Sequence, residues 1–373
     1  MLFVGLPSLL LAYTFYKSEI VWQGKLFEYY FQYYIISTTL LCLSFLSFFL
    51  NNEIKKNILI ILFSTLIGLY IVEGIFLFKS KNKWGTDPKD NQYIDFKIDE
   101  LKKKNIEYNL KNKFEFYAEQ KKLINNIVVT VPPKNYLSEN YKLFPLSGVS
   151  NSKTINCNES GFYSEYISDR YGFNNPDYEW NNKEIEYLII GDSFAHGACV
   201  NRPDDIASQL RKISGGSVIN LGYGGNGTLI EFATLKEYFE IRKFKNVIWI
   251  FYPNDFGSYN AEIKNKILKK YIENPNYSQE LHLKQNEIDL IAREMIEKKT
   301  KGMNIEKKIY FHDILKFLKL YNVRRIIQKK ESIINYNIFE TIKLAEKFAK
   351  KNSANFYFVY IPNVNELKKN YNS

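Results

Sequence analysis

Two long apolar segments near the N-terminus constrain the fold of this chain more than any other feature. Residues 27–50 and 58–78 each approach the ~20 residues that an α-helix needs to cross a bilayer core. Both segments are therefore predicted to be transmembrane helices. Residues 1–16 are also apolar but shorter. Pro7 and the lack of a basic start argue against a cleaved signal peptide, so a further membrane helix is predicted there.

The turn between the second and third segments predicts the orientation in the membrane. Lys55 and Lys56 lie in this turn, and short basic loops stay in the cytoplasm. Everything after Lys79 is then extracytoplasmic. Glu73 lies inside the third segment, and an intramembrane carboxylate is a candidate functional group. The favoured interpretation is that Glu73 snorkels or pairs with another helix.

The composition argues against two classes of function. The net charge is +11, but the lysines are spread along charged helical stretches, and no stretch interleaves arginine with aromatic residues. A nucleic-acid partner is therefore not expected. The three cysteines form neither a Cys-x-x-Cys motif nor a Cys/His cluster, so no metal site and no cofactor are predicted.

From Glu184 onward the hydrophobic pattern alternates between strands and helices. The predicted strands cover residues 187–190, 217–221, 247–251 and 356–361, and the predicted helices cover residues 203–213, 228–243 and 339–350. This order predicts an α/β fold with a three-layer, doubly wound parallel sheet, as in flavodoxin-like proteins. The domain spans residues 184–373, with a charged helical insertion at about residues 259–330. Residues 79–183 form either an extracytoplasmic cap or a linker.

Three loops after consecutive strands carry the groups that an acyl-transfer site needs. The first ends in Ser193, the second is the glycine-rich stretch 220–227, and the third holds Asn254 and Asp255. Loops at the carboxyl ends of parallel strands meet at one edge of a sheet. A serine nucleophile, backbone N–H groups and an asparagine amide would there surround a developing oxyanion. Each loop alone is more often an ordinary turn or helix cap, but the combination is harder to obtain by chance.

From about Glu184 the chain resembles the SGNH (GDSL-type) hydrolases, whose Ser, Gly, Asn and His lie in separate blocks. The resemblance implies that Ser193 is the nucleophile and that Gly225 and Asn254 are oxyanion-hole donors beside the Ser193 N–H. Asp192 and Asp255 would be supporting residues. The third block departs from the family pattern Gly-x-Asn-Asp, because Tyr252 and Pro253 stand at its start.

The resemblance also implies an activity and a location. Residues 157–176 and 191–200 are similar to membrane-tethered bacterial relatives, which implies a bacterial inner membrane protein with an extracytoplasmic catalytic domain. The implied function is a serine esterase or O-acyltransferase that forms an acyl-Ser193 intermediate. Its expected partners are the membrane and an acyl-ester substrate, either a lipid or a surface glycan.

The last block of the family, Asp-x-x-His, has no counterpart in this sequence. None of His196, His282 and His312 has aspartate three residues before it. A serine hydroxyl without a base is a weak nucleophile. Three explanations stay open: a fragment whose continuation carries the block, which is favoured; a catalytically inactive binding or scaffold protein; or an internal histidine that substitutes. A solute carrier or sensor with a soluble appendage is a weaker alternative.

Two cysteines, Cys157 and Cys199, lie in the part predicted to be extracytoplasmic. An oxidising exterior permits a disulfide, which would join residues 79–183 to the loop beside Ser193. Two cysteines in one compartment need not pair, so both states stay open. A Cα–Cα distance above ~7 Å would exclude the bond.

Overall fold

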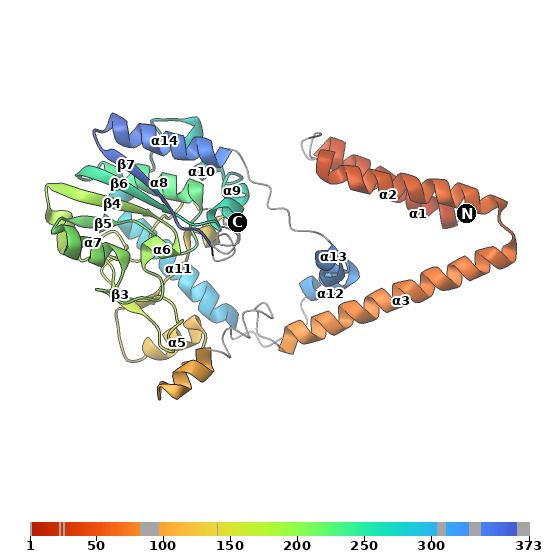
Figure 1. The fold of residues 1–373 in the computed structure, drawn as a ribbon, viewed down its shortest axis with the longest axis horizontal. Coiled ribbons are helices and arrows are strands. Elements are labelled where there is room, and N and C mark those ends of the chain that lie inside the picture. Colours follow the sequence, from red (N-terminus) through yellow and green to blue (C-terminus); the bar gives the residue numbers. More distant parts are fainter. Residues whose placement is uncertain are drawn as a thin grey trace, which may run out of the picture. The chain divides into compact units, whose positions relative to one another are not determined.

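The computed structural model describes residues 2–21, 24, 27–82, 97–139, 141–303, 311–327 and 337–363. It shows a mixed α/β protein whose chain divides into two compact units (Figure 1). The helical unit comprises Met1–Gly85 and Ile309–Lys329, and the α/β unit comprises Thr86–Lys308 and Lys330–Ser373. The chain therefore enters each unit twice.

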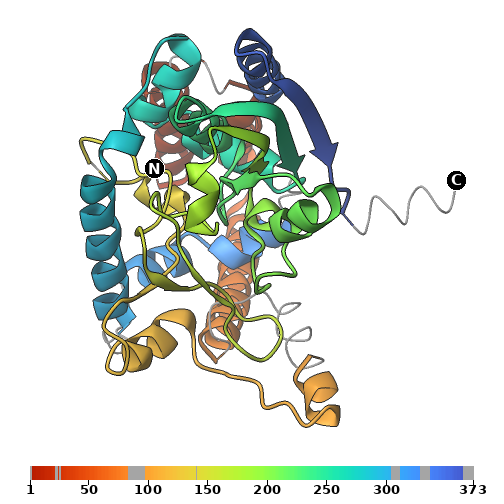
Figure 2. The same cartoon turned by 90° about the vertical axis from the view of Figure 1, so that its left-hand side faces the viewer.

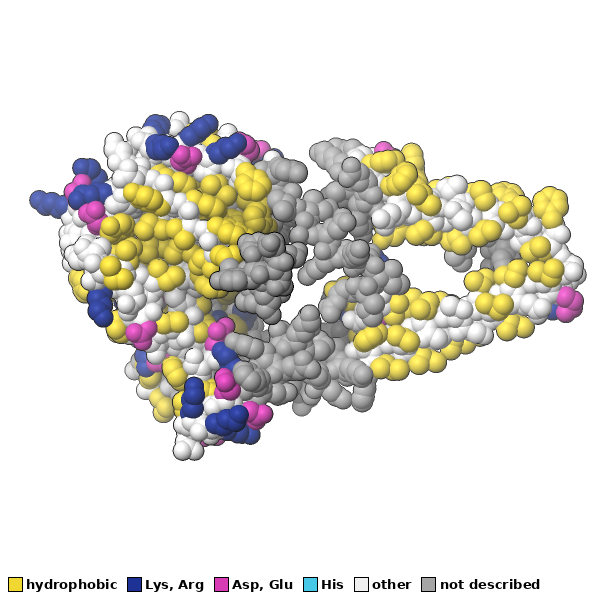
Figure 3. All heavy atoms as spheres, viewed as in Figure 1, with side chains coloured by type: hydrophobic (Ala, Val, Ile, Leu, Met, Phe, Trp, Pro, Cys, Tyr) yellow, Lys and Arg dark blue, Asp and Glu magenta, His cyan; other side chains and the backbone are white. Residues whose placement is uncertain are grey.

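The helical unit begins with three helices, α1 (Leu2–Phe15), α2 (Phe27–Leu46) and α3 (Asn52–Asn82). Two segments are long and apolar enough to cross a membrane, Tyr30–Phe49 and Asn52–Leu77. Only 11% and 6% of their most apolar windows are buried, which is unlike the core helix of a water-soluble protein. Figure 3 shows hydrophobic side chains along the surface of these helices. The predicted first helix forms, but its 14 residues are too short to count among these segments.

Two short helices, α12 (Phe311–Leu318) and α13 (Tyr321–Ile327), pack on α3. Glu73 of α3 is fully buried, and its carboxylate accepts hydrogen bonds of 2.9–3.1 Å from the N–H groups of Asn322 and Val323 and from Asn322 Nδ2. These N–H groups begin α13 and have no partner within it. Glu73 thus pairs with another helix.

The stretch expected to form one insertion, residues 259–330, is divided between the two units. Its first part remains in the α/β unit as α9 (Asp255–Glu262), α10 (Lys266–Glu273) and α11 (Gln285–Met303). Its second part, α12 and α13, belongs to the helical unit. The apolar side of α12 explains this position, because Phe317 lies 5.1 Å from the ring of Tyr70 on α3. Burial of this side against α3 removes apolar surface from water.

The α/β unit is built on a parallel four-stranded sheet with the order β5-β4-β6-β7. The strands are β4 (Glu184–Gly191), β5 (Val218–Asn220), β6 (Lys243–Phe251) and β7 (Asn355–Tyr360). Leu188 and Ile190 enter the larger hydrophobic cluster, whereas Ile189 enters a smaller cluster on the opposite face. This alternation is what a strand covered on both faces requires. The four predicted strands are confirmed.

Helices pack on this sheet (Figures 1 and 2). Residues of α8 (Thr228–Phe239) and α14 (Asn337–Lys351) enter the larger cluster with Trp249, and Ala207 of α7 (Ile206–Ser214) enters the smaller one. α7 begins three residues later than predicted, because Asp205 caps it by accepting the Ser208 N–H at 3.0 Å. On the edge strand β7, the side chains of residues 357–360 are exposed, and Figure 3 shows this apolar surface.

Residues 97–182 form a folded cap rather than a linker. The cap contains a helical stretch at 97–103, α5 (Lys113–Gln120), and a three-stranded sheet of β1 (Ile127–Val129), β2 (Lys153–Ile155) and β3 (Glu165–Ile167). Val128, Phe144 and Trp180 of the cap share the larger hydrophobic cluster with the main sheet. The cap and the sheet therefore have one continuous core.

Candidate active site

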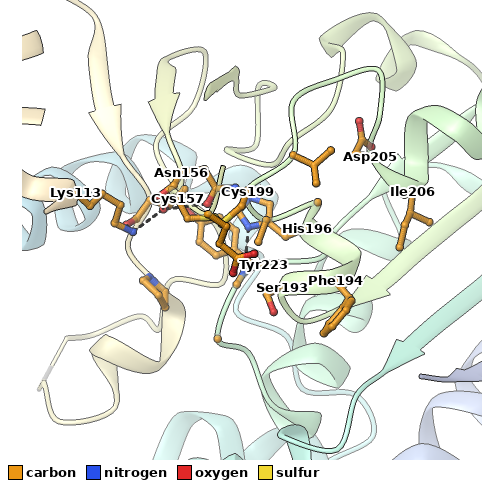
Figure 4. Close-up of a pocket in the computed structure, with 18 of the residues that line it drawn as sticks. Lys113, Asn156, Cys157, Ser193, Phe194, His196, Cys199, Asp205, Ile206 and Tyr223 are labelled. Atoms are coloured by element: carbon orange, nitrogen blue, oxygen red, sulfur yellow. Dashed lines mark hydrogen bonds between the residues drawn. A yellow bond between two sulfur atoms is a disulfide. The ribbon is translucent and has the colours of Figure 1, made fainter. Parts of the chain in front are cut away.

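Ser193 lies where the sequence predicts, directly after β4 at the carboxyl edge of the parallel sheet (Figure 4). Gly191 ends the strand at φ +149°, and a Cβ at this position would collide with the carbonyl oxygen of Ile250. Asp192 then caps the short helix α6 (Ser193–His196), accepting the N–H of Phe194 at 2.9 Å. The backbone is thus turned so that Ser193 is the first residue of the helix.

Asp192 brings the first and third sequence blocks together. Its Oδ2 atom accepts a hydrogen bond from Ser193 Oγ at 3.2 Å and another from Asn254 Nδ2 at 3.1 Å. Asp192 itself is fully buried. The candidate nucleophile and the candidate amide donor therefore contact the same oxygen atom, although they are 61 positions apart in the sequence.

The glycine-rich loop lies against the same serine. A Cβ placed on Gly224 would lie 3.9 Å from Ser193 Cβ and 3.6 Å from His196 Nδ1. The Gly224 N–H is already used, because it donates to His196 Nδ1 at 3.1 Å. The Gly225 N–H makes no hydrogen bond within the described part of the chain. Gly225, at φ +80°, is therefore the glycine whose N–H remains available to an oxyanion.

His196 is buried and neutral. Its Nδ1 accepts from Gly224, so the ring proton is on Nε2, which faces Tyr166 Oη at 3.1 Å. The ring stacks on Tyr223 with centroids 4.7 Å apart. Burial, with a smaller contribution from the charge of Lys113, lowers the pKa of His196 to about 3. His196 therefore holds the glycine-rich loop in place, and it does not act as the base for Ser193.

The other two histidines are not among the described residues that line this site. Of the histidines whose side chains are described, only His196 lines the pocket beside Ser193. His282 is on the short 3-10 helix Leu281–Leu283 of the α/β unit. His312 is on α12 in the helical unit, and its side chain lies outside the described part of the structure. The hypothesis of an internal histidine base gains no support from these positions.

Three further carboxyl groups are buried close to one another, and two of them, Asp255 and Glu231, lie near Asp192. Burial, together with the charge of Asp192, raises the pKa of Asp255 to about 8, and burial raises that of Glu262 to about 7. Burial also raises the pKa of Glu231 well above its usual value. Trp249 Nε1 donates to Glu231 at 2.6 Å, and the Leu229 N–H donates to Glu262 at 3.0 Å. Glu231 and Glu262 were not predicted, because helical periodicity gives no signal for a carboxyl group that faces a core.

These carboxyl groups do not form a metal site. No group of three or more histidine, cysteine, aspartate or glutamate residues in the described part of the chain has the geometry to hold a metal ion. At neutral pH Asp255, with a pKa of about 8, mostly holds its proton, which reduces the negative charge near Asp192. Asp255 contributes to the loop itself, because its carboxyl group accepts the N–H of Tyr252 at 3.0 Å.

Ser193 opens into a pocket of about 590 Å³ between the cap and the nucleophile loop (Figure 4). A disulfide between Cys157 and Cys199 borders the pocket, with a Cα–Cα distance of 4.8 Å. Cys157 belongs to the cap and Cys199 follows α6, so the bond ties the cap to the loop that carries Ser193. The remaining cysteine, Cys42, is free and exposed on α2.

The geometry of the three blocks is the basis for any functional assignment. Ser193, Gly225 and Asn254 come from the loops after β4, β5 and β6, and the structure brings these loops together. Comparisons with protein-family models, with curated proteins and with solved structures found no match to this chain.

Proposed function

We propose that this protein is a membrane-anchored serine esterase or O-acyltransferase of the SGNH type, with a three-layer, doubly wound domain. The observation that carries the proposal is the meeting of Ser193, Gly225 and Asn254 at the carboxyl edge of one parallel sheet. The pocket of about 590 Å³ beside Ser193 has the volume of a small-molecule site. Acylated surface glycans or lipids are the proposed substrates.

The proposed reaction proceeds through a covalent intermediate. Ser193 Oγ attacks the acyl carbonyl carbon, and its proton passes to a general base. The carbonyl oxygen becomes an oxyanion that receives hydrogen bonds from the N–H groups of Ser193 and Gly225 and from Asn254 Nδ2. The alcohol leaves with a proton, and water or an acceptor hydroxyl then takes the acyl group from Ser193.

The general base is the one component without an assigned residue. His196 is excluded by its pKa of about 3 and by the hydrogen bonds of both ring nitrogens. In the resemblance to the family, a histidine of an Asp-x-x-His block takes this role. This point favours one alternative function, a non-catalytic protein that binds an ester or glycan in the same pocket.

Labelling with a fluorescent fluorophosphonate separates the two functions. The probe phosphonylates a serine only when its hydroxyl is activated. We expect the full chain in native membranes to be labelled and the Ser193→Ala variant to lose the label. Equal signals from the two proteins would refute the esterase and leave the binding function.

We also propose that α2 and α3 span the membrane and that the α/β unit is extracytoplasmic. Lys55 and Lys56, near the start of α3, support a cytoplasmic connection between the two helices. The disulfide between Cys157 and Cys199 supports an oxidising compartment for the α/β unit. A membrane-impermeant reagent that modifies lysine in intact cells should modify the α/β unit and spare Lys55 and Lys56. The reverse pattern would overturn this orientation.

A further inference from the structure

A chain of hydrogen bonds in the cap ends at the pocket of Ser193. The Lys113 ammonium donates to Thr130 O at 2.8 Å and to Thr130 Oγ1 at 2.9 Å. The Thr130 hydroxyl can in turn donate to Asn156, whose backbone oxygen and Oδ1 both lie 3.4 Å from Thr130 Oγ1. In this arrangement the amide oxygen of Asn156 faces Thr130. All three residues line the pocket (Figure 4).

The Asn156 amide leaves its Nδ2 donors without an acceptor. Asn156 is 5% exposed, and Nδ2 has no hydrogen-bond partner in the described part of the chain. A buried N–H group without an acceptor costs free energy, and nearly all such groups in folded proteins have a partner. Lys113 likewise forms no ion pair with a described carboxylate.

The pocket that Lys113 lines contains a second lysine, Lys134, and three carboxyl groups. Burial, with the charge of Lys299 on α11, lowers the pKa of Lys113 to about 8, so the amine is still mostly charged at pH 7. A second cation lies toward the oxyanion loop, because a Cβ on Gly225 would lie 3.2 Å from Lys134 Nζ. The other titratable groups that line the pocket are Glu159, His196, Asp204, Asp205 and Tyr223. Asp205 is already engaged as the cap of α7.

We propose that Lys113 and Asn156 form a subsite for an anionic group of the substrate, a carboxylate or a phosphate. An ammonium and an amide N–H on one wall supply the charge-assisted hydrogen bonds that oxyanions require. The inference rests on the proposed function and makes it more specific, because it names acidic acyl esters as the substrate class. The disulfide holds the subsite in place, since Cys157 is the residue after Asn156 and is bonded to Cys199 beside Ser193.

Ligand-detected saturation-transfer NMR tests the subsite on the full chain in detergent micelles. The anionic probes are D-glucuronate and sn-glycerol 3-phosphate, and the neutral probe is methyl α-D-glucopyranoside. We expect at least one anionic probe to bind and the neutral probe to bind at least tenfold more weakly. Stronger binding of D-glucuronate would assign an acidic sugar unit to the subsite, and stronger binding of glycerol phosphate would assign a phosphate group. Equal binding of all three probes would overturn the proposal.

Four variants assign the binding to these residues. Lys113→Met and Asn156→Asp should each weaken binding of the anionic probe about tenfold or more. Lys122 is an exposed lysine just after α5, and the control variant Lys122→Met should bind the probe as tightly as the unchanged protein does. D-glucuronate should bind about tenfold more weakly at pH 9 than at pH 7, because the charged fraction of Lys113 falls from about nine tenths to about one tenth. Lys113→Arg should keep binding and lose this pH dependence.

The outcomes separate this inference from the proposed function. Binding requires no reaction at Ser193, so the Ser193→Ala variant should bind the probes unchanged. Failure of the fluorophosphonate labelling with intact Lys113-dependent binding would refute the esterase and leave the subsite. Binding that is the same in Lys113→Met and in the unchanged protein would refute the subsite, whatever the labelling shows.

Discussion

Removal of the disulfide between Cys157 and Cys199 should destabilise the α/β unit strongly. The bond closes a loop with a sequence separation of 42 residues. In the chain-entropy description, a loop of this length constrains the unfolded chain by about 4 kcal/mol, between the ~3 kcal/mol of a 15-residue loop and the ~4.7 kcal/mol of a 100-residue loop. The Cys157→Ser/Cys199→Ser variant should therefore lose about 4 kcal/mol of unfolding free energy.

Urea unfolding followed by tryptophan fluorescence measures this loss. Trp180 and Trp249 are fully buried in the α/β unit, and replacement of Trp22 and Trp84 by phenylalanine leaves these two as the reporters. With a slope of about 2–3 kcal/mol per molar urea, the midpoint should fall by about 1.3–2 M. Dithiothreitol should shift the unchanged chain by the same amount.

A matched control is available in the third cysteine. Cys42 is exposed on α2 in the helical unit, so Cys42→Ser should leave the midpoint unchanged. A loss below about 1 kcal/mol in the double variant, without a change in slope, would refute the reasoning. It would mean that the unfolded chain is not constrained by this loop, or that the two cysteines are not paired in the folded protein.

Three other substitutions test the site. His196→Phe leaves the Gly224 N–H without its acceptor and should lower the free energy of urea unfolding by about 2–3 kcal/mol. The pH profile of fluorophosphonate labelling between pH 5 and 8 should not change in this variant, because the pKa of His196 is about 3. The pKa of Asp255 in the folded protein, about 8, lies above its usual 3.8. Between about pH 4 and 8 the folded protein therefore holds a proton that the unfolded chain releases, and the unfolding free energy should fall as the pH rises. Asp255→Asn should make this slope shallower by up to about 1.4 kcal/mol per pH unit. Gly225→Ala should cost about 1–2 kcal/mol of unfolding free energy, because its φ is +80°. It should also reduce fluorophosphonate labelling, because the new Cβ would lie 3.0 Å from Lys134 Cε and displace the loop. The control Gly215→Ala, at φ +68° with nothing within 4 Å of the new Cβ, should show the backbone cost alone.

The sequence was sufficient to predict the sheet and the position of Ser193. Both follow from local patterns: short runs rich in β-branched residues form the strands, and the groups that follow them must meet at one edge. The Glu184–Gly191 and Lys243–Phe251 strands are longer than predicted, because their first residues alternate charged side chains with the buried Ile185 and Phe244. This alternation lies outside the continuous apolar run that marks each strand in the sequence.

Long-range contacts could not be predicted in the same way. The hydrogen bond from the Gly224 N–H to His196 Nδ1 could not be predicted, because it joins residues 28 positions apart in different elements. The partner of Glu73 could not be predicted either, because Asn322 on α13 follows 249 positions later in the chain. Amphipathic periodicity identifies a helix with an apolar side but does not say which surface covers it. The division of residues 259–330 between the two units is the consequence.

The pairing of Glu73 with α13 also sets an order of events during synthesis. At about 5–20 residues per second, a ribosome needs about 12–50 s to proceed from Glu73 to Asn322. Throughout this interval the Glu73 carboxylate lacks the N–H groups of α13 that later donate hydrogen bonds to it. In the proposed membrane orientation a carboxylate without donors is costly within the bilayer, so α3 would be incomplete as a membrane helix until most of the α/β unit has been made. Completion of the helical unit therefore waits for synthesis of the α/β unit.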